Sequence, residues 1–194
     1  MSLILIFGPQ AVGKMTVGRA LEKRIDGRLL FNHETIDIFS KFLGFTSATF
    51  ELSRQTRRGL FKAFTENTPT NVTTSLIFTA VMAFDIEEDM AFFDEIVQIF
   101  SSAGQAIYFV ELVANLDVRL ARNQHEDRLA AKPSKRDIAF SESELLAAAD
   151  IHRLNSLDGE ILHRFPNVSY LKINNTHLAA QQVADQIVTT FHLT

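Results

Sequence analysis

The segment Gly8-Pro9-Gln10-Ala11-Val12-Gly13-Lys14-Met15-Thr16 directly follows the apolar run from Leu3 to Phe7. Five consecutive apolar residues are typical of a central parallel strand that is buried on both faces. After the segment, Val17, Ala20, Leu21 and Ile25 recur with helical spacing. The stretch therefore predicts a strand, a glycine-containing turn and a helix, in that order.

This order of elements is typical of a phosphate-binding site. Gly8 and Gly13 permit backbone angles that a Cβ atom would forbid, so that successive N–H groups can point into one concavity. The helix adds the positive end of its dipole, and Lys14 supplies a cation for the β- and γ-phosphates. An ordinary strand-to-helix turn with an incidental lysine is the competing interpretation. The residues expected to bind a nucleotide are Gly8, Ala11, Val12, Gly13, Lys14, Met15 and Thr16.

Length and composition limit the remaining possibilities. A chain of 194 residues is long enough for one domain with its own core. The net charge of −4 argues against a broad nucleic-acid-binding surface. The absence of cysteine excludes disulfides and thiolate metal sites, and the N-terminal apolar run is too short for an export signal or a membrane span. We therefore expect a cytoplasmic protein without a nucleic-acid or membrane partner, whose oligomeric state the sequence does not indicate.

Strand-like and helical patterns alternate along the chain. The expected strands are Leu3 to Phe7, Leu29 to Phe31, Val72 to Val81, Ala106 to Val113 and Val168 to Ile173; the expected helices are Thr16 to Ile25, Ile36 to Leu43, Glu51 to Phe64, Glu87 to Phe100, Leu116 to Ala131, Ser143 to Phe165 and Leu178 to Phe191. Such alternation predicts one α/β domain, residues 1–194, with a parallel sheet of about five strands covered on both faces. Residues 34–71 and 119–137 are expected to be additions at the carboxyl edge of the sheet, where ligands bind.

Two carboxylates follow the second expected strand, in Asn32-His33-Glu34-Thr35-Ile36-Asp37. A carboxylate here would accept a proton from a substrate hydroxyl and orient it for attack. Glu34 is the first candidate and Asp37 the second. The alternative is that Glu34 is a first-turn residue of the next helix, where the helix dipole favours acids. His33 is expected to pack or to form hydrogen bonds rather than to act in catalysis.

Basic residues are concentrated in two segments. Arg54, Arg57 and Arg58 share a helix, so Arg54 with Arg57 or Arg58 would clasp a substrate carboxylate or phosphate unless they form a solvated face. Six of the nineteen basic residues fall within eighteen positions of the second segment: Arg119, Arg122, Arg128, Lys132, Lys135 and Arg136. A phosphoryl-transfer enzyme needs such cations on a segment that closes over the site. Because Glu126 and Asp127 are interleaved, an exposed charged helix is the alternative.

No acid directly follows the third apolar run, so an obvious magnesium-orienting aspartate is missing. Asp85 is the nearest, but it clusters with Glu87, Glu88 and Asp89 as residues at a helix start do. The structural interpretation is therefore favoured there.

Taken together, these motifs resemble the P-loop small-molecule kinases, the class that includes shikimate kinase and adenylate kinase. The resemblance spans nearly the whole chain, although only the first motif is highly specific. It implies a three-layer α/β/α P-loop NTPase fold, ATP and Mg²⁺ as cofactors, and a helical insertion and a basic lid that hold a small-molecule phosphate acceptor. It also implies that Glu34 contacts the acceptor, that Arg119, Arg122 and Arg128 meet the phosphates, and that Asn174 and Asn175 line the adenine pocket.

The sequence departs from shikimate kinases at several positions. Met15 stands where these enzymes usually place a Ser or Thr whose hydroxyl binds Mg²⁺, so the resemblance leaves Thr16 as a helper in metal binding. Asn32 stands where they tend to have an aspartate, and Val81-Met82-Ala83-Phe84 is not their glycine-rich turn. Shikimate is therefore not the expected substrate.

The leading hypothesis is ATP-dependent phosphorylation of a small metabolite, nucleoside, nucleotide or antibiotic. A nucleotide-binding regulatory NTPase without a small-molecule acceptor is the alternative, and a loop that only binds nucleotide is a third possibility.

Overall fold

The computed structural model describes residues 1–132 and 135–194. The strands are β1 (Ser2–Phe7), β2 (Gly27–Phe31), β3 (Ser75–Ala80), β4 (Ala106–Val113) and β5 (Ser169–Asn174). The helices are α1 (Lys14–Glu22), α2 (Asn32–Leu43), α3 (Ser47–Glu66), α4 (Glu87–Ser102), α5 (Leu116–Asn123), α6 (Glu126–Ala131), α7 (Ile138–Ile151), α8 (Glu160–Arg164) and α9 (Ala180–Phe191).

The strands that the structure describes form one parallel sheet in the order β2-β3-β1-β4-β5. β1 lies in the middle, and all six of its residues are buried. At the carboxyl end of the sheet, Phe7 pairs with Ala80 of β3 on one side and with Glu111 of β4 on the other. The phosphate-binding segment therefore leaves the sheet at its centre, as the sequence predicts.

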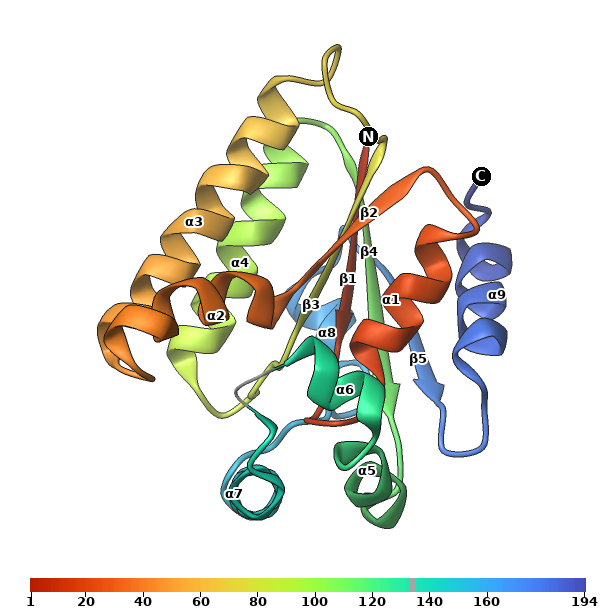
Figure 1. Ribbon diagram of the computed structural model, residues 1–194. Coiled ribbons are helices and arrows are strands. Elements are labelled where there is room, and N and C mark those ends of the chain that lie inside the picture. Colours follow the sequence, from red (N-terminus) through yellow and green to blue (C-terminus); the bar gives the residue numbers. More distant parts are fainter. Residues whose placement is uncertain (133–134) are drawn as a thin grey trace.

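Helices cover both faces of this sheet (Figure 1). α3 and α4 lie on one face, where a core rich in phenylalanine includes Phe61, Phe78, Phe93 and Phe109. α1 and α9 lie on the other face over an aliphatic core. This is the three-layer α/β/α architecture that the alternating pattern predicts.

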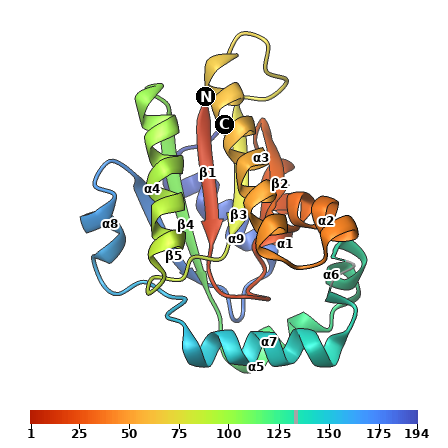
Figure 2. The ribbon, with the colours of Figure 1, turned by 90° about the vertical axis from the view of Figure 1, so that its left-hand side faces the viewer.

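The remaining helices gather at the carboxyl ends of the strands. Figure 2 shows α7 running across this end of the sheet, with α6 beside the start of α2. Because all five strands are parallel, the loops after β1, β2, β3 and β4 open at this same edge, where open α/β sheets bind their ligands. Of the helices that the structure describes, none combines the length and the apolar character needed to cross a bilayer.

Two of the predicted helices are wrong in extent. The segment from Leu116 to Ala131 is two helices, because His125 caps the second one by accepting a hydrogen bond from the backbone N–H of Asp127 at 3.3 Å. The segment from Ser143 to Phe165 is also interrupted, between Ile151 and Glu160. The third strand begins later than predicted, at Ser75, and Val72 is 89% exposed. Pro133 and Ser134, within the predicted lid segment 119–137, lie outside the described residues.

Candidate active site

The turn after β1 has the backbone geometry of a phosphate-binding loop. Gly8 has a φ of 139° and Gly13 a φ of 108°, and Ala11 adopts the left-handed region with a φ of 58°. A Cβ atom on Gly8 would lie 2.3 Å from the carbonyl oxygen of Leu112, so glycine is required there. These angles turn the chain sharply into α1, whose N-terminus then faces the turn.

Lys14 lies at the first position of α1, beneath this turn. Its Nζ donates to the carbonyl oxygens of Gly8 at 2.6 Å and Pro9 at 2.7 Å. Burial lowers the pKa of Lys14 well below its usual value, and the nearby charges of Lys132, Arg128 and Arg119 lower it further. Among the described residues, no carboxylate pairs with Lys14, and the charges that act on it are those of other cations. An anionic ligand would therefore stabilise the charged form of Lys14.

A cavity of about 250 Å³ opens above the loop. Its lining comprises the loop and first turn of α1 (residues 11–17), the lid residues Arg122, His125, Asp127, Arg128 and Lys132, and the C-terminal residues Asn175, Leu178 and Ala180. The cavity thus brings together three of the predicted segments: the loop, the basic segment and the loop after β5. Thr16 reaches it from an exposed position, whereas Met15 is buried.

Two of the predicted lid arginines donate hydrogen bonds to the backbone of the phosphate-binding loop. Arg119 is buried and its Nε donates to the carbonyl oxygen of Gln10 at 2.9 Å. Arg122 donates to the carbonyl oxygens of Val12 at 3.1 Å and of Asn175 at 2.8 Å. Desolvation by burial lowers the pKa of both arginines. Both therefore fix the backbone that would cradle the phosphates, in addition to contributing positive charge.

The two asparagines after β5 differ in position. Asn175 is buried, and its Nδ2 donates to the carbonyl oxygen of Val12 at 2.8 Å, so it connects this loop directly to the phosphate-binding turn. Asn174 does not line the cavity; its side-chain oxygen accepts a hydrogen bond from the backbone N–H of Thr176 at 3.0 Å. The structure therefore brings Asn175, but not Asn174, to the loop.

The residues around the loop suit the phosphates of a nucleotide better than a metal ion bound directly by carboxylates. Among residues 1–132 and 135–194 there is no group of three or more acidic or histidine side chains that could hold a metal ion. The one acid that lines the loop cavity, Asp127, has a side chain that is 78% exposed. The loop and its cations fit the phosphates of ATP, and a Mg²⁺ ion there would be held by phosphate oxygens, water and the hydroxyl of Thr16 rather than by a carboxylate cluster.

The two candidate base residues, three positions apart on α2, make different contacts. Glu34 caps the helix: its Oε2 accepts from the backbone N–H of Phe31 at 2.8 Å, as in the alternative reading of its position. Burial raises the pKa of Glu34, and its charged neighbours are Glu22 and Arg19. Asp37 lies one turn later, 3.2 Å from Nδ1 of His33, and its charge acts on Lys132 of the lid. Neither lines the loop cavity, but Asp37 is the one that acts electrostatically on the lid.

A second cavity, of about 550 Å³, lies between α2, α3 and α4. Arg54 and Arg57 line it, as the helical spacing predicts, and their guanidinium groups lie 6.0 and 5.4 Å from the ring centre of Phe92. Arg58 does not reach the cavity, because it pairs with Glu95 at 2.7 Å on another face of α3. The pair that would clasp a substrate is therefore Arg54 with Arg57.

Arg57 is the more unusual of the two. It is buried, and it donates hydrogen bonds to neutral groups: the backbone and side-chain oxygens of Ser53 and the side-chain oxygen of Asn32. Burial, with a smaller contribution from the neighbouring charge of Arg54, lowers its pKa to about 10. A buried guanidinium without a carboxylate partner among the described residues is costly unless a ligand supplies the negative charge.

Three residues that line the two cavities are not among the binding or catalytic residues that the sequence singles out: Asn32, Asp89 and Lys132, the last of which it marks only as one of six lid cations. Asn32 lines the second cavity and accepts a hydrogen bond from Arg57. The feature of the sequence that could have identified it is its position directly after β2. Asp89 also lines the second cavity, and although it receives a hydrogen bond from the backbone N–H of Ala83 at 3.1 Å, burial raises its pKa. Lys132 lines the loop cavity. Asp85, by contrast, binds the backbone N–H of Arg153 and the ring of His152, as a structural residue does.

No protein-family model and no curated protein sequence matches this chain. Solved structures do match along nearly its whole length. The tunicamycin resistance protein of Deinococcus radiodurans is 18% identical, with a TM-score of 0.57 over 100% of this chain and 98% of that one. Shikimate kinase from Acinetobacter baumannii, solved with shikimate, is 18% identical, with a TM-score of 0.54 over 98% and 92% of the two chains.

A third match is the APS kinase CysC of Mycobacterium tuberculosis, solved in complex with AMPPNP and APS. It is 12% identical, with a TM-score of 0.52 over 98% of this chain and 97% of that one. The chain has the fold of the P-loop small-molecule kinases. At these identities the similarity establishes the fold and leaves the substrate open.

Proposed function

We propose that this protein is an ATP-dependent phosphotransferase that moves a terminal phosphoryl group to a hydroxyl or phosphate of a small molecule. The observation that carries the proposal is the meeting of Lys14, Arg128 and Lys132 around one cavity above the turn after β1, where the described residues supply no carboxylate cluster to neutralise them. Such a set of cations, next to backbone N–H groups at a helix N-terminus, is what the phosphates of a nucleotide require. The kinase fold agrees with this assignment.

Each part of the site has a separate role in this reaction. ATP would supply the phosphoryl group, and Mg²⁺ would neutralise part of the phosphate charge. Lys14 would stabilise the negative charge that develops on the transferred group, while Arg119 and Arg122 keep the loop in shape. Gly8 and Gly13 would allow the loop to approach the phosphates closely.

Asp37 is the better placed of the two candidate bases. Asn32 and Ile36, which are one helical turn apart, line the acceptor cavity, and Asp37, the next residue after Ile36, acts electrostatically on Lys132 of the lid. Asp37 would accept the proton of an acceptor hydroxyl as the oxygen of that hydroxyl forms its bond to phosphorus and the bond to ADP breaks. Glu34, which caps α2, would keep the helix start in place.

The acceptor would occupy the cavity between α2, α3 and α4. Arg54 and Arg57 would bind a carboxylate or phosphate on it, and the rings of Phe50, Phe92 and Phe93 would contact its apolar part. Asp89, on the wall formed by α4, would accept a hydrogen bond from it. Because this cavity and the loop cavity open at the same edge of the sheet, an acceptor and a nucleotide could be held next to each other.

Two measurements test the proposal. Calorimetry with ATP and GTP, with and without magnesium, should show binding of ATP by the wild-type protein. ADP release should then be measured with a panel of metabolites, nucleosides, nucleotides and antibiotics, and it should depend on the acceptor added. Failure to bind either nucleotide would refute the proposal. Turnover that is independent of every acceptor would instead favour the regulatory NTPase.

A further inference from the structure

The basic residues of the lid differ in what they are bound to. The side chains of Arg119 and Arg122 are bound to backbone carbonyl oxygens of the phosphate-binding turn and of the loop after β5. Arg128 donates from Nε to the side-chain oxygen of Asn123 at 3.1 Å, and Lys135 is paired with Glu144 at 2.6 Å. These four cations are thus at least partly engaged by the protein itself.

Lys132 is different. It follows the last residue of α6 and lines the same cavity as Lys14. Within the part of the chain that the structure describes, its ammonium group donates no hydrogen bond, whereas Arg128 and Lys135 both have partners. Its ammonium group has three N–H donors, and none of them is bound to an acceptor among the described residues. Lys132 is therefore available to a ligand in that cavity.

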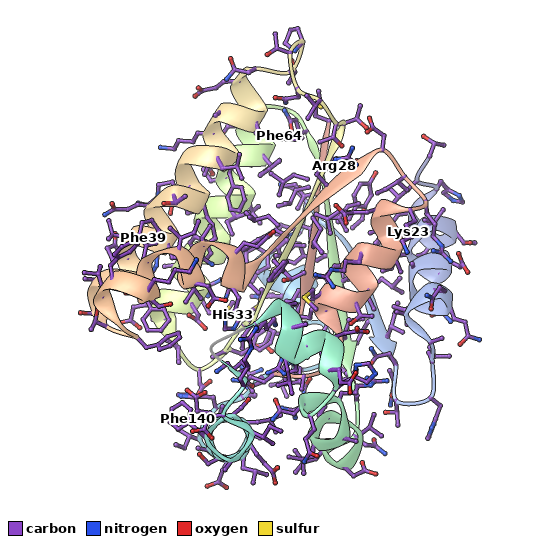
Figure 3. All side chains as sticks on the ribbon, viewed as in Figure 1. Lys23, Arg28, His33, Phe39, Phe64 and Phe140 are labelled. Atoms are coloured by element: carbon purple, nitrogen blue, oxygen red, sulfur yellow. The ribbon has the colours of Figure 1, made fainter. Side chains whose placement is uncertain are left out.

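The surroundings of Lys132 point to the charge of that ligand. Lys14, Arg19, Arg128 and Lys135 repel it, whereas Asp37 of α2 attracts it. His33, which lies where the start of α2 meets the end of α6 in Figure 3, is also within its electrostatic reach. Desolvation by burial and these cations lower the pKa of Lys132 to about 7. A negatively charged ligand would relieve this repulsion and keep the ammonium charged.

The position of Lys132 also indicates which phosphate it would meet. Its electrostatic partners come from two parts of the site: Lys14, at the start of α1 under the loop, and Asp37, on α2. In the proposed reaction, the phosphorus that is attacked must lie between the loop, which holds the nucleotide, and the base, which holds the acceptor hydroxyl. The terminal phosphate is the part of ATP that occupies this place, and ADP lacks it.

We propose that Lys132 is the lid residue that contacts the terminal phosphoryl group of ATP, and that Arg119 and Arg122 act mainly by holding the loop. The inference rests on the proposed function and assigns to one lysine a contact that the family resemblance gives to arginines. Lys132 is then a catalytic residue of the transfer, because its charge lies against the group that moves.

The test compares the binding of ATP with that of ADP, and it needs no acceptor. Calorimetry of Lys132→Met should show ATP affinity lowered by about 10- to 100-fold, the effect of one lost hydrogen bond to a charged group, with ADP affinity nearly unchanged. Lys132→Arg should retain most of the preference for ATP. Lys135→Met, whose lysine is paired with Glu144, is the matched control and should bind both nucleotides like the wild type.

Other outcomes separate this inference from the proposed function. If the wild type binds both nucleotides and Lys132→Met weakens them equally or not at all, the assignment of Lys132 is wrong while the kinase proposal stands. If Arg122→Ala, rather than Lys132→Met, selectively weakens ATP, the terminal contact belongs to the arginine. A wild-type protein that binds neither ATP nor ADP would overturn both proposals. Circular dichroism and thermal melting of each variant would establish that it is folded.

Discussion

Two regions of this molecule hold charged side chains in opposite surroundings: in one they are paired with opposite charges and hydrogen-bond partners, and in the other they lie among like charges. Glu111 of β4 is fully buried, and it accepts hydrogen bonds from the backbone N–H of Ser156 at 3.0 Å, from the hydroxyl of Ser156 and from Tyr170 at 2.6 Å, with Lys172 3.2 Å away. Lys14 follows the turn after β1, the strand that pairs with β4, and the charged groups that act on it are further cations.

Residues of the first region stabilise the fold, whereas those of the second are positioned to bind a ligand. Around Glu111, every charge is offset within the protein, and the network attaches the segment after α7 to β4 and β5. Burial and the adjacent Glu111 raise the pKa of Tyr170, so its hydroxyl remains a donor. Among the described residues, the charged groups that act on Lys14 and Arg57 are further cations, and around Lys132 three cations oppose the one attracting carboxylate, Asp37. Uncompensated charge in a cavity is a sign of a functional site, where stability is lost in favour of binding.

The largest expected effect concerns the compensated region. Glu111→Ala removes a buried acceptor and leaves Lys172, Tyr170 and Ser156 without it, so the free energy of unfolding should fall by about 3–5 kcal/mol. Urea denaturation measures this loss. Glu95→Ala, which breaks a partly exposed pair with Arg58, is the control and should cost at most about 1 kcal/mol. Equal losses in the two variants would show that the Glu111 network does not anchor this segment.

Lys14→Ala tests the uncompensated region. The affinity for ATP should fall by about 100- to 1000-fold, as expected for the loss of a preorganised donor to phosphate. The free energy of unfolding should stay the same or rise, because a cation is removed from among cations. Calorimetry and urea denaturation measure the two effects, and Lys23→Ala, at an exposed position just after α1, is the control. A large loss of stability with ATP affinity retained would make Lys14 a structural residue.

The central part of this architecture could be predicted from the sequence because its signals are local. The apolar run before Gly8, the two glycines and Lys14 define β1, the turn and α1 within the first 22 residues, and the structure confirms that arrangement. The parallel sheet of five strands followed from the alternation of patterns. The break at His125 could not be predicted from periodicity, because a side-chain cap causes it.

The site residues could be predicted only in part, because their roles depend on contacts across the fold. Spacing placed Arg54, Arg57 and Arg58 on one helix, but the position of Glu95 on α4 decides that Arg58 turns away from the cavity. Composition identified the segment as basic, but it did not show which of its cations line the loop cavity. The predicted helix breaks after α5, where a separate helix, α6, begins, and Lys132, directly after α6, lines that cavity. The role of Glu34 likewise depends on a contact that spacing does not define, the hydrogen bond that its side chain accepts from the backbone N–H of Phe31.

A smaller effect is expected in the acceptor cavity. With any acceptor that supports ADP release, Arg54→Gln should raise the KM for that acceptor by about 10- to 100-fold, because one charged hydrogen bond is lost, and should leave the affinity for ATP unchanged. Arg58→Gln is the matched control on the same helix and should have little effect on either. If Arg58→Gln raised the KM as much as Arg54→Gln, the acceptor would not lie between α2, α3 and α4.

The smallest expected effect is a dependence of ATP affinity on pH. Lys132 has a pKa of about 7 in the free protein, and a bound phosphate would raise this pKa because it favours the charged ammonium. Below pH 7 the lysine is charged in both states, so its contribution to binding is fully present. As the pH rises above 7, the free protein must take up a proton to bind, and affinity falls until the pKa of the bound state is passed. Each unit by which the pKa rises corresponds to about tenfold in affinity.

Lys132→Arg isolates this contribution. An arginine stays charged throughout this range, so the variant should lose the fall in affinity above pH 7. The titration of the terminal phosphate near pH 6 and that of Lys14 remain in both proteins and cancel in the comparison. Calorimetry in two buffers of different ionisation enthalpy at pH 8 should show proton uptake on ATP binding by the wild type and less by the variant. The same uptake in both would mean that another group, with Lys14 the first candidate, takes up the proton, and that the cations of this cavity do not divide as proposed.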